Sequence, residues 1–135
     1  MIITIIIFVV SLQIVFNFND SLDYNTSTVL ENIEFSAEYI EDKNIVRIIF
    51  QDTTNKTGFA ILEILGMDVT FHQEYHFIEQ SHFVEDVYIQ DVPKYGWKTT
   101  PVILEIQHAE FGKIGLKTEV YQKGETIPKI IVEKK

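Results

Sequence analysis

Three histidines and one glutamate occur close together in the sequence, and these residue types bind metal ions. His72, Glu74 and His76 alternate along one segment, and His82 follows shortly after. Imidazole and carboxylate groups are common zinc ligands. On a helix, His72 and His76 would lie one turn apart on the same face. On a strand they would share a face but lie about 13 Å apart, too far for one ion. The pattern therefore predicts either a metal site at these four residues or a solvated polar face.

The secondary structure of residues 68–78 decides between these two interpretations. Apolar side chains recur at alternate positions, at Val69, Phe71, Tyr75 and Phe77, which is the period of a strand. A helical spacing also fits part of the segment. We expect a strand, because the surrounding sequence has the same rhythm.

An aromatic loop is the second candidate site. Tyr95 and Trp97 flank a glycine, Lys98 follows, and Trp97 is the only tryptophan of the chain. Aromatic side chains on a loop can stack on a sugar or fill a pocket of a partner protein. A large aromatic ring can equally fill the core of the domain. We predict a binding site at Tyr95, Trp97 and Lys98, with a core position for Trp97 as the alternative.

The sequence offers little that would support catalysis. It has no cysteine and no Gly-x-Ser-x-Gly nucleophile motif, and it lacks a glycine-rich phosphate loop. Ser81 and His82 are adjacent, so on a strand their side chains would point to opposite faces. We therefore expect a protein that is not an enzyme and that needs no cofactor.

The start of the chain is strongly apolar. Residues 1–16 carry no charged side chain, and the first charge is Asp20. Such a segment is typical of a signal peptide or a membrane anchor, although it lacks a basic start and is short for a transmembrane helix. It could also be a buried strand, or a strand donated to a neighbouring subunit. The sequence predicts an extracytoplasmic protein, either secreted or held at the cell surface through residues 2–16.

Three tripeptides match the acceptor pattern for N-glycosylation. They begin at Asn19, Asn25 and Asn55. This short pattern agrees with export and marks exposed positions of a secreted protein.

Composition narrows the class of partner. The chain has 135 residues and a formal net charge of −9. Nucleic-acid binding needs a basic surface, so we expect no nucleic-acid partner. The 46% hydrophobic content indicates a folded domain rather than a disordered chain.

The remaining sequence predicts an all-β domain. Residues 17–28 are polar and are interpreted as a linker, and residues 29–135 as one domain. Alternating apolar residues separated by Gly, Asn and Asp turns predict seven to eight strands. They fall near residues 33–40, 45–50, 59–65, 68–78, 83–92, 102–107, 114–121 and 127–132. This pattern favours an antiparallel β-sandwich of immunoglobulin-like or fibronectin-like architecture.

Together these features predict a protein that acts by binding. The leading hypothesis is an adhesion module or accessory subunit of a cell-surface complex, with a protein as its partner. The first alternative is a structural subunit of a fibre or lattice that self-assembles by donating its N-terminal strand. The second is an extracytoplasmic protein that binds a metal through its histidines.

Overall fold

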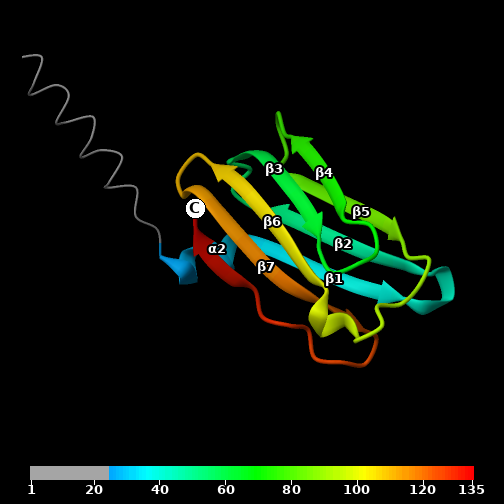
Figure 1. The fold of residues 1–135 in the computed structure, drawn as a ribbon. Coiled ribbons are helices and arrows are strands. Elements are labelled where there is room, and N and C mark those ends of the chain that lie inside the picture. Colours follow the sequence, from blue (N-terminus) through cyan, green and yellow to red (C-terminus); the bar gives the residue numbers. More distant parts are fainter. Residues whose placement is uncertain (1–24) are drawn as a thin grey trace, which may run out of the picture.

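The protein folds as one curled β-sheet that forms a half-barrel (Figure 1). The computed structural model describes residues 25–135. The predicted leader, most of the predicted linker and Asn19 lie outside the described residues. Eight strands follow one helix in the described chain, with spatial order β4-β3-β6-β7-β1-β2-β5, and β8 pairs with β7. The elements are α2 (Thr26–Asn32), β1 (Ile33–Ile40), η1 (Glu41–Lys43), β2 (Ile45–Asp52), β3 (Thr57–Ile64), β4 (Phe71–His76), β5 (His82–Tyr88), η2 (Trp97–Thr99), β6 (Pro101–His108), β7 (Gly112–Gln122) and β8 (Ile131–Lys134).

The all-β expectation is confirmed, and each predicted strand overlaps an observed one, although the strand expected at residues 83–92 already ends at Tyr88. Alternation of apolar and polar residues places one face of each strand in the core, as in β1, where Ile33, Phe35, Ala37 and Tyr39 are buried. Residues 71–76 form a strand, as expected. The last strand begins only at Ile131. Pro128, which lies inside the range expected for this strand, has no N–H to donate to a strand ladder.

The arrangement of the strands differs from the expected sandwich. A sandwich has two antiparallel sheets packed face to face, whereas here one continuous path links seven of the strands. β1 and β7 pair in parallel over Ala37–Tyr39 and Val120–Gln122, and the other pairings are antiparallel. The sheet is therefore mixed, and the expectation of a wholly antiparallel domain is wrong on this point.

Helix α2 corrects the expectation of a linker at residues 26–28. The Asn25 side chain caps its first turn by accepting a hydrogen bond from the Ser27 N–H at 2.9 Å. Val29 is fully buried in the core cluster. The helix is thus attached to the domain by one apolar anchor and belongs to the folded unit. Within residues 25–135, no helix has the length and apolar character needed to span a membrane.

The two edges of the half-barrel, β4 and β5, approach each other through aromatic side chains. The rings of Tyr75 on β4 and Phe83 on β5 are stacked, with centroids 4.0 Å apart and planes within 2°. Phe77 and Phe50 pack beside them. No backbone ladder joins β4 to β5 in the described residues. Side chains, not hydrogen bonds, therefore close this side of the barrel.

The strands define two ends of the molecule with different character. The network end carries α2, the β2–β3 turn, the β4–β5 loop and the β6–β7 turn. The loop end carries residues 41–44, 65–70, 89–100 and 123–130 (Figure 1). Asn25, which follows the predicted leader and linker, lies at the network end.

Candidate functional site

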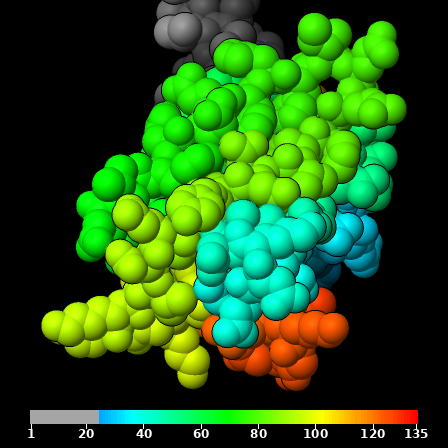
Figure 2. Space-filling view, turned by 90° about the vertical axis from the view of Figure 1, so that its right-hand side faces the viewer, coloured from blue at the N-terminus to red at the C-terminus, as the bar shows by residue number. Residues whose placement is uncertain are grey.

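The loop end gathers most of the exposed large hydrophobic side chains. Figure 2 looks onto this end, where the β1–β2 turn (cyan), residues 89–100 (yellow-green) and the end of β7 (orange) face the viewer. Nine large hydrophobic residues are exposed in the described chain, and five of them line hollows at the loop end: Val69, Tyr88, Val92, Tyr95 and Ile127. Soluble proteins seldom gather exposed apolar groups unless a partner covers them.

The first hollow, called here the tryptophan hollow, contains the predicted binding residues. It has a volume of about 610 Å³ and lies between the loop at 95–98 and residues 119–129. Tyr95, Trp97 and Lys98 all line it, so the structure brings the three predicted residues together. Tyr95 is 77% exposed and Lys98 is exposed. These two side chains are therefore accessible to solvent at the rim of the hollow.

Trp97 occupies a core position. It is only 8% exposed, and its ring lies 5.0 Å from that of Tyr39. Its indole N–H donates to no group in residues 25–135. Trp97 therefore forms the floor of the hollow and positions the loop that carries Tyr95 and Lys98.

The second hollow, called here the acidic hollow, brings together segments that the sequence did not connect. It has a volume of about 650 Å³ and lies between residues 66–69, which precede β4, and residues 88–95, which begin at the last residue of β5. Its lining includes the exposed Val69, Tyr88, Val92 and Tyr95, together with Asp68, Asp91 and Lys94. Tyr95 lines both hollows, so the two form one continuous surface at the loop end.

The predicted metal ligands do not come together. His72, Glu74 and His76 share the outer face of β4, where His72 lies 3.3 Å from Glu63 and 3.6 Å from Glu74. The His76 ring packs on Phe59 instead. His82 begins β5, and its Nδ1 lies 3.2 Å from the Phe50 carbonyl. Within residues 25–135 no three metal-binding side chains are grouped as a metal ion would require.

Two of the predicted glycosylation residues have structural roles in the described chain. Asn25 caps α2. Asn55 lies in the β2–β3 turn with φ 56° and accepts a hydrogen bond from the Ser81 N–H. Both residues are exposed, as a glycan acceptor must be. Attachment of a glycan at either residue stays a prediction.

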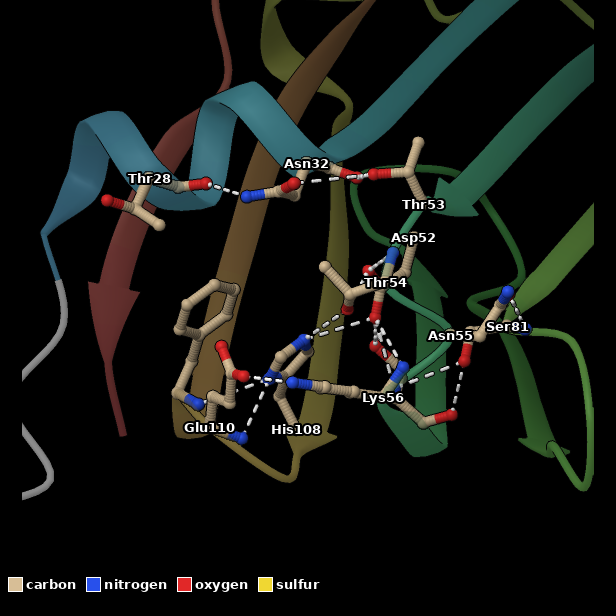
Figure 3. A network of polar contacts seen from close by, with 12 residues as sticks. Thr28, Asn32, Asp52, Thr53, Thr54, Asn55, Lys56, Ser81, His108 and Glu110 are labelled. Atoms are coloured by element: carbon tan, nitrogen blue, oxygen red, sulfur yellow. Dashed lines mark hydrogen bonds and ion pairs between the residues drawn. The ribbon is translucent and has the colours of Figure 1, made fainter.

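A buried polar network holds the network end together (Figure 3). At its centre, the Asp52 carboxylate accepts hydrogen bonds from six donors. Oδ1 accepts from the N–H and hydroxyl of Thr54 at 2.9 and 2.6 Å. Oδ2 accepts from the Lys56 N–H at 3.2 Å, from the N–H and hydroxyl of Thr57 at 3.1 and 2.8 Å, and lies 3.1 Å from His108 Nε2. One carboxylate thus fixes the whole β2–β3 turn to the end of β6.

The hydrogen bonds of His108 define its protonation state. Its Nδ1 accepts from the N–H groups of Glu110 and Phe111 at 3.0 and 3.1 Å. An imidazole nitrogen that accepts two hydrogen bonds carries no proton. The single proton of the neutral ring therefore lies on Nε2, which donates to Asp52. The structure holds a neutral histidine beside an ionised aspartate.

This arrangement shifts both pKa values downward. Burial lowers the pKa of His108, although the charge of Asp52 opposes the shift. Burial alone would raise the pKa of Asp52, but the hydrogen bonds from Thr54 and Thr57 and the nearby His108 outweigh it. Both groups therefore favour the protonation states that they hold near neutral pH.

Acid is expected to weaken the fold in two steps. A lowered histidine pKa means that the unfolded chain binds a proton first, near pH 6.5, so stability falls as the pH drops below that value. Asp52 adds a second loss below about pH 3.9, where the unfolded carboxyl becomes protonated. The protonation of His108 alone changes the free energy of unfolding by at most about 1.4 kcal/mol per pH unit. Urea unfolding between pH 8 and pH 5 measures this change. In the variant His108→Gln, the free energy of unfolding should depend less on pH over this range. An equal slope in this variant would contradict the assignment.

The network is structural in its chemistry. Asp52, Thr57, Ser81 and His108 are at most 4% exposed. The Ser81 hydroxyl donates to the Thr57 carbonyl at 2.7 Å and accepts from the Thr57 N–H. Each group is bonded to the chain, so no substrate could reach a nucleophile or base here. The only signal in the sequence for the hydrogen-bonded network around Asp52 is an aspartate followed by threonines in a turn, which is typical of Asx turns.

Comparison with known proteins gives no relative for this chain. No protein-family description, no curated protein and no solved structure matches it. The candidate surface therefore rests on its own geometry.

Proposed function

We propose that this protein is a non-catalytic binding module that contacts a partner protein through its loop end. The observation that carries the proposal is the gathering of exposed apolar side chains around two adjoining hollows. Aromatic residues in such positions commonly dominate the energy of an interface. Tyr95 belongs to both hollows and is the residue expected to contribute most.

The distribution of rigid and exposed parts supports this role. The polar network joins four segments at the network end, namely α2, the β2–β3 turn, the β4–β5 loop and the β6–β7 turn. The loop end, in contrast, presents its side chains to solvent. The apolar residues 2–16 suit export or anchoring. An anchor that joins the domain at Asn25 would present the loop end away from a membrane, as an adhesion module or accessory subunit at a cell surface requires.

Replacing Tyr95 with serine is expected to weaken partner binding by about tenfold or more, as for an interface hot spot. The full chain would be affinity-purified from its native cells, and the amount of co-purified partner would be compared between variants. Ile78→Ser is the matched control, because Ile78 is 98% exposed but lies in the β4–β5 loop at the network end. Equal loss in both variants, or loss only in the control, would contradict the proposal.

A further inference from the structure

We propose that the acidic hollow binds an extended segment of a partner polypeptide that carries lysine or arginine. The main chain of this segment would pair with the free edge of β5 where that edge reaches the hollow. The inference rests on the proposed function and names the chemistry that one of the two hollows would recognise.

The first observation is the unpaired edge beside the hollow. β5 pairs only with β2 and β4 only with β3 in the described residues, so both strands end the sheet. An open sheet edge can accept an extended peptide as an additional strand. Tyr88, the last residue of β5, lines the hollow. The edge of the sheet and the hollow are therefore continuous.

The second observation is the shape of the space between the two edges. The aromatic stack of Tyr75 and Phe83 joins β4 and β5 near the network end. Along most of their length, however, the Cα atoms of the two strands stay more than 8 Å apart. The space between the strands is thus closed at one end by side chains, and the acidic hollow lies at the other end.

The third observation is the charge of the hollow. Asp68 and Asp91 are exposed, and neither forms an ion pair in residues 25–135. The only cation in the lining, Lys94, lies 5.6 Å from the centroid of the Tyr95 ring.

Carboxylates beside exposed aromatic rings suit a cationic side chain. Tyr88 and Tyr95 offer aromatic faces, which attract lysine and arginine in addition to the carboxylates. The apolar Val69 and Val92 would contact the alternate side chains of an extended segment. A segment in which basic and apolar residues alternate matches both features.

The same charges argue against two other occupants. A second copy of the chain would carry another net charge of −9, and like net charges oppose the association of two copies. Residues 2–16 contain no lysine or arginine, so a donated N-terminal strand would leave the carboxylates without a partner. A basic segment of a different protein fits the hollow best.

Three fluorescein-labelled probes test the proposal by fluorescence anisotropy with the full chain in mild detergent. The probes are the decapeptides (Val-Lys)5 and (Val-Glu)5, and a (Val-Lys)5 with every backbone nitrogen methylated so that neither edge of the peptide can donate to a strand. We expect (Val-Lys)5 to bind about tenfold or more tightly than either other probe. Similar binding of all three probes, or no binding of (Val-Lys)5, would overturn the proposal.

A pair of charge variants locates the site. The double variant Asp68→Asn, Asp91→Asn should weaken (Val-Lys)5 binding by about tenfold or more. The double variant Glu41→Gln, Asp42→Asn removes the same charge from the β1–β2 turn at the same end and should leave binding unchanged. Equal weakening by both, or a dimer of the chain that the first double variant dissociates, would overturn the assignment. If the peptide tests fail while Tyr95→Ser still loses the native partner, only this inference falls and the proposed function stands.

Discussion

Replacing Asp52 with alanine is expected to lower the free energy of unfolding by about 3–5 kcal/mol, because several N–H and O–H donors lose their acceptor at about 1–3 kcal/mol for each one that stays buried and unpaired. The substitution would leave the buried donors of Thr57 and His108, and the partly buried donors of Thr54 and Lys56, without their acceptor. Urea unfolding followed by circular dichroism at pH 7.5 measures the loss.

Asp86→Ala provides the control for this measurement. Asp86 also forms a close ion pair, at 2.8 Å from Arg47, but both side chains are partly exposed on the outer face of the sheet. Exposed pairs contribute at most about 1 kcal/mol. Comparable losses in the free energy of unfolding for Asp52→Ala and Asp86→Ala would show that the hydrogen bonds to Asp52 do not hold the β2–β3 turn as described.

Replacing Gly66 with alanine is expected to lower the free energy of unfolding by about 2–5 kcal/mol and to disturb the acidic hollow. Gly66 has φ +80°, a conformation that costs an L-residue about 1–2 kcal/mol. A Cβ atom there would also lie 2.3 Å from the Thr99 carbonyl oxygen. Forcing atoms into occupied space costs a further 1–3 kcal/mol, roughly.

Gly124→Ala separates the two contributions. Gly124 has φ +92°, but nothing lies within 4 Å of the position that its Cβ atom would take, so only the backbone cost applies. Thermal and urea unfolding of both variants should show a clearly larger loss for Gly66→Ala. If the two glycines give the same loss, Thr99 does not pack against Gly66 and the wall of the hollow is not rigid.

The sequence predicted the strands well because their signal is local. Alternate burial of Ile33, Phe35 and Ala37 follows directly from the two-residue period of a strand. Which strands become neighbours is not a local property. The parallel pairing of β1 with β7 joins residues about eighty positions apart in the chain, and no turn signal specifies it. The strand pattern alone fits a sandwich and a curled single sheet equally well. For this reason the expected sandwich was wrong although the strands were located correctly.

The binding surface was predicted only in part for a related reason. Tyr95, Trp97 and Lys98 lie in one loop, so their composition drew attention to it. Val69 and Tyr88 belong to distant segments that meet only in the folded chain. The burial of Trp97 depends on Tyr39, a residue of another strand. The His108–Asp52 pair likewise joins two turns that look unrelated in the sequence.

Site-specific photo-crosslinking in living cells tests the central claim most directly. A benzophenone amino acid would replace Tyr95 or Tyr88 at the loop end, and Ile78 or Leu30 at exposed positions elsewhere. We predict a covalent adduct of one defined partner mass from positions 95 and 88, and none from positions 78 and 30. Adducts confined to positions 78 or 30 would contradict a binding surface at the loop end.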